Sequence, residues 1–198
     1  TDLRLNNNLL NEIDLSKNIL LKNLFLNKNN LSEINLNKNI LLERIYIGNN
    51  KLTDISFNLN TELKTISAIN NNITSPIITD NLKLEIIDFS NNIINSIDLK
   101  KNINLNYINL ENNKLKQINL NQNIGVDDLY LANNFIENIN IDKNIELKNI
   151  YFQNNQLDSL DITNNLFLKT INVANNKLSF LNTIKNSDVT TLIMSNND

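Results

Sequence analysis

A repeat of 21 residues runs through the whole chain and constrains its fold more than any other feature. Alignment on the Asn residues starts successive units at positions 21, 42, 63, 84, 105, 126, 147, 168 and 189, without one insertion or deletion. The first unit lacks its opening residue and the last stops after ten, so residues 1–198 hold nine nearly complete repeats and a half. A fixed period of this length is typical of a solenoid, in which each repeat forms one coil and packs on its neighbours.

Each unit divides into two similar halves of ten and eleven residues. The unit 105–125 reads LNYINLENNK and then LKQINLNQNIG, and both halves follow L-x-x-L-x-L-x-x-N. The fourth, fifth and sixth places alternate inward, outward and inward, which is the period of a half-buried strand, and no segment carries a sustained helical stripe. The sequence therefore predicts an all-β solenoid with little or no helix. We expect a right-handed coil with two parallel β-sheets, one per half, and slight curvature.

Asn occupies the ninth place of every half, in the first and in the second half alike. An AT-rich genome can enrich Asn anywhere in a chain, but it cannot place Asn at a fixed period. An inward-turned Asn at each corner can hydrogen-bond the loop backbone and the same Asn one coil away. The sequence therefore predicts a structural Asn ladder, whose first-half members include Asn29, Asn50, Asn71, Asn92, Asn113, Asn134, Asn155 and Asn176.

These motifs resemble those of the leucine-rich-repeat family. LKNLFLNKNNL at 21–31 and LNYINLENNKL at 105–115 match its signature L-x-x-L-x-L-x-x-N-x-L. The doubled form, with IDLSKN at 13–18 and IDLKKN at 97–102, resembles the nested 21-residue class called IRREKO repeats and, more distantly, the surface repeats of internalins. The resemblance covers the whole chain and implies the solenoid fold, whereas function has to be argued from specific sites.

Composition argues against catalysis. The chain has no Cys and no His, so it lacks thiolate chemistry, the commonest general base and the commonest metal ligand. We expect no enzyme activity, no metal site and no cofactor. The net charge of −3 argues against nucleic-acid binding, which needs a concentrated basic face, and no apolar run is long enough for this segment to insert directly into a membrane.

Aromatic residues recur at outward places of the first-half strands. The fifth place holds Phe25 and Tyr46 on neighbouring coils, and Tyr130 and Tyr151 on another such pair. Exposed Tyr is enriched at interfaces, but aromatic pairs on adjacent strands also stabilise a sheet by themselves. Both interpretations stay open. The candidate partner-binding residues are Phe25, Arg44, Tyr46, Tyr107, Tyr130 and Tyr151.

Two further surface patterns concern charge. Lys22, Glu43, Lys64 and Glu85 alternate in sign on adjacent coils, which predicts surface ion pairs worth little each. Acidic residues gather on the second-half face, where calcium would accept such oxygens but no calcium-binding loop accompanies them. A solvated acidic face is the favoured interpretation for Glu12, Asp14, Glu33 and Asp54.

Two coils depart from the pattern. The segment 63–83 places Ala68 and Pro76 at core positions and turns Ile69 and Ile77 outward. A local bulge, a bend or a partner contact at Ile77 would each explain this, and we favour the bulge because Pro cannot donate to a strand ladder. In the segment 178–188 Thr183 takes a core place while the next residue points outward.

The sequence favours a non-catalytic recognition module of a bacterial cell-surface or secreted protein. Its expected partner is another protein, with a glycan as the second kind of ligand, and outer-membrane association fits the same context. The alternatives are a structural spacer or docking subunit of a cell-envelope complex and, less favoured, the targeting domain of a secreted effector. Because neither end carries the polar cap that a solenoid needs, we expect residues 1–198 to be one domain within a longer protein.

Overall fold

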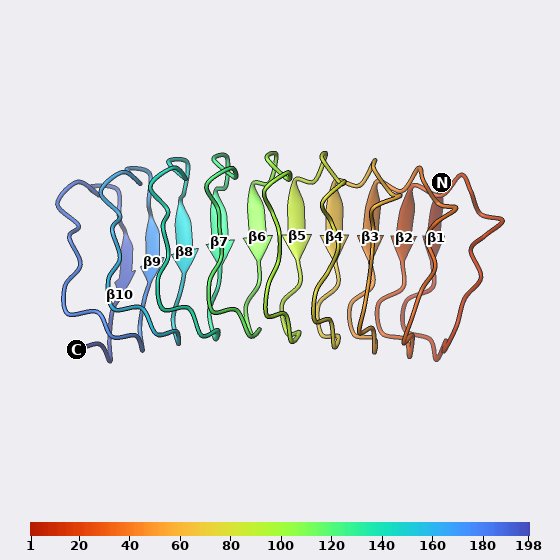
Figure 1. The fold of residues 1–198 in the computed structure, drawn as a ribbon, viewed down its shortest axis with the longest axis horizontal. Helices are drawn as coiled ribbons and strands as arrows, with labels where there is room; N and C mark the ends of the chain where they lie inside the picture. Colours follow the sequence, from red (N-terminus) through yellow and green to blue (C-terminus); the bar gives the residue numbers. More distant parts are fainter.

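The computed structural model describes all residues 1–198 as a row of stacked coils with ten short parallel strands and no helix (Figure 1). The predicted all-β solenoid is confirmed. The strands are joined in sequence order into one ten-stranded sheet. Their bounds are β1 Asp2–Arg4, β2 Asn23–Phe25, β3 Arg44–Tyr46, β4 Thr65–Ser67, β5 Ile86–Asp88, β6 Tyr107–Asn109, β7 Asp128–Tyr130, β8 Asn149–Tyr151, β9 Thr170–Asn172 and β10 Thr191–Ile193.

The register of the sheet follows from the period of the sequence. Each strand pairs in parallel with residues 21 positions further along, as Leu24 pairs with Ile45 and Phe25 with Tyr46. The middle residue of β2 to β9 is buried and its two neighbours point away from the core, except that Thr65 in β4 is also buried. Side chains of equal rank in the repeat therefore form continuous rows along the sheet, one residue per coil.

The second-half segments do not form the second sheet that the sequence predicts. Between them the structure has a single isolated bridge, from Ser56 to Ile77. A parallel ladder needs strands about 4.8 Å apart, but open grooves separate adjacent coils on this face, one of them lined by Ile97, Asp98, Asn119 and Asn121. The prediction of two parallel sheets is therefore wrong: the alternation of inward and outward residues is present, but the backbones stand too far apart to pair.

The core is continuous from coil to coil. One cluster of 42 buried apolar residues runs along the solenoid, and its largest side chains are Phe57, Phe89 and Phe152. Both halves contribute to it, since Leu110 of a first half and Leu120 of the second half of the same coil are both buried. Burial of both halves explains why their apolar patterns are alike although only one half is paired.

The irregular coil at 63–83 keeps its register, so the favoured bulge is not present. Ala68 and Pro76 are buried and Ile77 is exposed, as the pattern predicts. Backbone bonds join Ile77 N to Ile55 O at 3.0 Å and Phe57 N to Ile77 O at 3.0 Å. Pro76 has no N–H to donate, but its neighbour Ile77 makes both backbone bonds of the isolated bridge to Ser56 on the preceding coil.

Candidate functional site

The outer face of the sheet carries two aromatic patches. The first, called here the N-terminal patch, consists of Arg4, Phe25, Arg44 and Tyr46. The rings of Phe25 and Tyr46 stack with their centroids 5.0 Å apart and their planes at 2°. The Arg4 guanidinium lies 4.5 Å from the centroid of Phe25, a cation–π contact.

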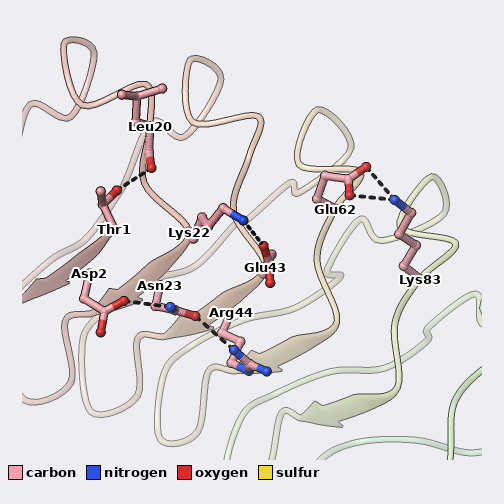
Figure 2. Close-up of polar contacts among 9 residues, drawn as sticks. All are labelled: Thr1, Asp2, Leu20, Lys22, Asn23, Glu43, Arg44, Glu62 and Lys83. Atoms are coloured by element: carbon pink, nitrogen blue, oxygen red, sulfur yellow. Dashed lines mark hydrogen bonds and ion pairs between the residues drawn. The ribbon is translucent and has the colours of Figure 1, made fainter.

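Arg44 is held by a chain of polar contacts across the first three strands (Figure 2). Its Nη1 donates to Asn23 Oδ1 at 3.3 Å, and Asn23 Nδ2 donates to Asp2 Oδ1 at 2.7 Å. Beside this chain Lys22 Nζ lies 2.7 Å from Glu43 Oε1. The predicted alternation of charges therefore closes one ion pair, while Lys64 and Glu85 form none.

The C-terminal patch consists of Tyr107, Tyr130 and Tyr151. Tyr130 and Tyr151 stack at 4.7 Å with planes at 5°, and Tyr107 packs against Tyr130 at 5.3 Å in a tilted arrangement of 41°. Tyr107 comes from the third place of its repeat and Tyr130 from the fifth, so the contact crosses diagonally between β6 and β7. Three aromatic side chains from consecutive coils thus form one surface.

Carboxylates surround the C-terminal patch. Burial, with the nearby negative charge of Asp128, raises the pKa of Tyr130 to about 12. Burial and the charge of Asp88 likewise raise the pKa of Tyr107. The pKa of Glu111 is raised by its burial and then by Asp88. Asp88 and Glu111 were not among the predicted site residues, although their fifth and seventh places in the repeat put them on the face that carries the tyrosines.

The two patches therefore differ in charge. Arginines border the N-terminal patch and carboxylates border the C-terminal patch, with the polar residues Ser67, Asp88 and Asn109 in the row between them. All five aromatic residues are half-buried. Their mutual stacking contributes about 0.5–1.5 kcal/mol per pair, which supports the structural interpretation, and the remaining exposed surface is open to a partner.

The first-half corner Asn residues bond to backbone rather than to one another. Asn113 Nδ2 donates to Phe89 O at 3.0 Å on the preceding coil and to Leu110 O at 3.1 Å on its own. Its Oδ1 accepts the N–H of Ile94 at 2.9 Å. The predicted bonds to loop backbone are confirmed. The same pattern holds coil after coil at Asn29, Asn50, Asn71, Asn92, Asn134, Asn155 and Asn176.

Side-chain bonds between Asn residues of adjacent coils occur one place earlier, at the eighth place. There Asn175 Nδ2 donates to Asn154 Oδ1 at 2.7 Å, and Asn154 Nδ2 to Asn133 Oδ1 at 2.8 Å. Every eighth residue of the first half has a positive φ between 51° and 59°. Asn adopts this left-handed conformation more readily than most residues, so backbone geometry explains its recurrence. The predicted bond to the same Asn one coil away is absent from the first-half column. It is present in the second-half column, where Asn123 Nδ2 donates to the backbone oxygen of Asn102 at 2.9 Å.

The second-half corner Asn residues from Asn39 onward are buried. Asn123 Nδ2 donates to Leu99 O at 3.1 Å and to Asn102 O at 2.9 Å. The Oδ1 atom of most of this column has no hydrogen-bond partner in the protein. These atoms belong to Asn39, Asn81, Asn102, Asn123, Asn144, Asn165 and Asn186.

The acidic residues of the second-half face line an open groove. Glu12 and Asp14 stand on one coil and Glu33 on the next, with Ile13 and Ile34 at the base. No group of three or more acidic side chains in the chain comes together closely enough to hold a metal ion. The structure also contains no helix that is long and apolar enough to cross a membrane.

An exposed apolar row was missed at the sequence level. It follows the second-half corner Asn of each coil, in the turn that leads into the next strand. Its members are Ile19, Ile40, Leu82, Ile103, Ile124, Ile145 and Leu166. The signal was present as an Ile or Leu directly after the corner Asn, but a periodic apolar residue is ordinarily assigned to the core.

Three solved structures of bacterial leucine-rich-repeat proteins are similar to this chain. The functional domain of InlJ from Listeria monocytogenes, described as including a cysteine ladder, superposes with a TM-score of 0.97 at 26% identity, over 99% of this chain and 44% of that one. A leucine-rich-repeat protein of Leptospira interrogans gives a TM-score of 0.92 at 20% identity, over 99% and 55%. YopM, a leucine-rich effector protein of Yersinia pestis, gives 0.80 at 24%, over 99% and 60%.

This chain spans about half the length of the solved structures it matches. No family model matches the sequence, and no curated protein matches it significantly. The chain has no Cys and hence no counterpart to the cysteine ladder of InlJ. The fit over nearly the whole chain, with a 21-residue coil and one parallel sheet, shows that its fold is that of the leucine-rich-repeat solenoids.

Proposed function

We propose that this chain is a non-catalytic recognition module of a bacterial cell-surface or secreted protein and binds a protein partner through the outer face of its sheet. The observation that carries the proposal is the C-terminal patch, where Tyr107, Tyr130 and Tyr151 form one surface bordered by acids. Aromatic side chains give large contact area at low entropic cost and are enriched among residues that dominate binding.

The charges around this patch specify the kind of partner. The carboxylates of Asp88, Glu111 and Asp128 lie close enough to raise tyrosine pKa values. A Lys or Arg side chain of the partner could bond these carboxylates with its charged end, a charge-assisted contact, while its methylene groups pack on the exposed edges of the rings. The patch therefore suits a protein segment in which a basic residue stands beside an apolar one.

The cellular context of the proposal is supported by the named relatives, which come from Listeria, Leptospira and Yersinia. The sequence that flanks this segment in its gene gives the direct test. A secretion signal with a wall-sorting or outer-membrane domain is expected, and a cytoplasmic enzyme domain fused to the repeats would contradict the surface context.

The binding proposal is tested by selecting peptides from a displayed random library on the purified chain. We expect enriched peptides with a Lys or Arg next to an aromatic or aliphatic residue. Their affinity should fall at least tenfold, by roughly 1.4 kcal/mol, when Tyr107, Tyr130 and Tyr151 are replaced together by Ala.

The matched control removes exposed aromatic rings elsewhere. Phe135 and Phe180 are exposed and lie outside the strands, so replacing both by Ala should leave peptide binding unchanged. Peptides that bind the triple Tyr variant as well as the parent chain would contradict the proposal. Binding confined to a glycan array, with no peptide enriched, would reject the protein partner.

A further inference from the structure

An apolar row runs along the edge of the solenoid where the chain enters the strands, the upper edge in Figure 1. Each member follows the second-half corner Asn, which is buried in every coil except the first, and exposes about half of its side chain, between 49% and 56%. The row is interrupted only by Thr61 and stops at Ser187. Its members are Ile19, Ile40, Leu82, Ile103, Ile124, Ile145 and Leu166.

Further apolar side chains widen this row, and the chain itself covers none of them. Leu20, Leu41, Leu59 and Phe167 lie beside it and are exposed. Near the C-terminal end, Ile145, Leu166 and Phe167 line one open groove. Together with the row, these further side chains make eleven half-exposed apolar side chains. If each exposes about half of the area that full burial of an apolar side chain removes from water, they expose roughly 350–650 Å² of apolar surface. A stable interface takes about 800 Å² from each partner, a little over half of it apolar.

Charged residues border the apolar row on both sides. Two positions before the row stands an exposed position that holds Asp80 and Lys143 in two coils, and one position after the row stand Lys83 and Glu146 in the same coils. The next coil beyond the row, with Ser187 at the row position, has Lys185 and Asp188 at the equivalent places. In each of these coils the residue before the row and the residue after it have opposite signs. In no coil do they carry the same sign.

We infer that this apolar row is the interface of a parallel dimer, in which a second copy of the chain lies side by side with the first and the two-fold axis runs along the solenoid. That symmetry places every row residue opposite its own counterpart, coil against coil. It also places the position before the row opposite the partner's position after the row. Lys143 then faces Glu146 of the second copy, and likewise Lys185 faces Asp188. Asp80 faces Lys83 in the same way, although within each chain Asp80 pairs with Lys101 at 3.1 Å and Lys83 with Glu62 at 2.6 Å.

The charge pattern selects this arrangement over an antiparallel one. If the two rows ran in opposite directions about Ile124, the positions before the row would face each other. Lys101 would then oppose Lys143, and after the row Glu62 would oppose Asp188. Like charges placed opposite each other disfavour an interface, so complementarity favours the parallel pairing. The dimer leaves the outer face of the sheet free, so the inference does not rest on the proposed function.

The oligomeric state is measured by sedimentation velocity from roughly 1 µM to roughly 300 µM, a range that brackets a micromolar dissociation constant. We expect a dimer whose dissociation constant rises at least tenfold when Ile103 and Ile124 are both replaced by Lys. Both side chains are exposed, so at a protein concentration where both are monomeric the variant should unfold at the same urea concentration as the parent. The control Phe180→Lys alters an exposed apolar residue on the second-half face and should leave the dimer intact.

The orientation is tested by charge exchange. Lys143→Glu should weaken the dimer, and Lys143→Glu combined with Glu146→Lys should restore it. In the antiparallel arrangement Lys143→Glu would instead strengthen the dimer, because it would remove the repulsion from Lys101. A stronger dimer in this single variant therefore overturns the parallel pairing.

Cross-linking gives an independent measure, because the chain has no native Cys. Leu82→Cys and Leu166→Cys, each alone, should form covalent dimers with a short thiol-to-thiol cross-linker, since each faces its own copy. Products formed only when the two variants are mixed would overturn the proposal. A chain that stays monomeric at the highest concentration overturns it too, including one that binds anionic lipid vesicles instead.

Discussion

Asn113 and Asn123 hold the same place in the two halves of one coil, yet they should differ greatly in their contribution to stability. Asn113 Nδ2 donates to Phe89 O and Leu110 O. Without Asn113 both carbonyls still accept a hydrogen bond, Phe89 O from Asn92 Nδ2 and Leu110 O from Asn134 Nδ2. Asn113 Oδ1 is the sole acceptor for the N–H of Ile94, which is fully buried. Replacement of Asn113 by Ala thus leaves one buried donor without any partner.

Asn123 leaves nothing unpartnered when it is removed. The carbonyls it bonds, Leu99 O and Asn102 O, also accept the backbone N–H groups of Asn102 and Leu105. Its own Oδ1 is buried without a partner, so Ala removes an unfavourable group together with two bonds.

The magnitudes follow from these contacts. Asn113→Ala should lower the free energy of unfolding by about 3–5 kcal/mol, from two bonds near 1 kcal/mol each and an orphaned N–H worth about 1–3. Asn123→Ala should cost about 0–1 kcal/mol, because loss of two bonds is offset by removal of the unpartnered oxygen. The difference between the two variants is therefore about 3 kcal/mol.

Urea unfolding followed by circular dichroism measures both values, provided the slope against urea concentration is the same for both variants. Both substitutions lie in the unit 105–125, away from the ends, so fraying affects them equally. Losses that agree within about 0.5 kcal/mol, the error of such comparisons, would refute the reasoning. They would mean that the oxygen of Asn123 is as well satisfied as that of Asn113.

Three further outcomes are expected. Lys28 has the left-handed backbone conformation that Asn adopts at the same position of the other repeats, so Lys28→Asn should raise the free energy of unfolding by about 0.5–1 kcal/mol. The control Lys17→Asn, at an exposed position, should not raise it. An unchanged free energy of unfolding in Lys28→Asn, measured with urea, would contradict the prediction. A Cβ on Gly48 would lie 2.6 Å from Ile69 Cγ1, so Gly48→Ala should lower the free energy of unfolding by about 1–3 kcal/mol. Adding Ile69→Ala should restore most of that stability. If it does not, the added Cβ clashes with backbone and not with the Ile69 side chain. The pKa of Tyr130 is about 12 in the folded chain and about 10 unfolded. The folded state therefore holds this proton longer, and stability should fall between these pH values, less steeply in Tyr130→Phe. Identical pH slopes for the two proteins would contradict the shift.

The sequence was sufficient to predict the solenoid, its register and the aromatic neighbours. A period of 21 residues without an indel places residues of equal rank on adjacent coils, so the contact of Phe25 with Tyr46 follows directly from the repeat. The residue type at each position of the repeat then determines which rows are aromatic, charged or apolar. Tyr107 is instructive because it contacts Tyr130 diagonally, from the third place to the fifth. That contact depends on ring size and sheet twist, which the pattern does not specify.

The second sheet could not have been judged from the pattern. An inward, outward, inward alternation requires only an extended backbone against a core, and it is satisfied whether or not the neighbouring coil lies within bonding distance. In Ile118 and Leu120 the alternation is present, yet no strand forms there. The distance between coils on that face is set by how the two halves pack across the core, which is a property of the whole coil.

Internal repetition provides a comparison of each position with itself across coils. The corner Asn column is kept because its amide bonds the backbone of two coils, and the Leu and Ile columns because they fill the core. The exposed apolar row is kept in seven of nine coils, although its side chains neither bond backbone nor fill the core and about half of each remains in water. Codon bias toward Ile would scatter Ile over exposed places, whereas the position before the row, which is equally exposed, holds no Ile: it is Lys, Asp, Gln or Asn in eight of nine coils and Leu59 in the ninth. A column that stays apolar in seven of nine coils without a role inside the coil is best explained by a contact outside the coil. A contact that repeats along the solenoid in this way is best made by a partner with the same period.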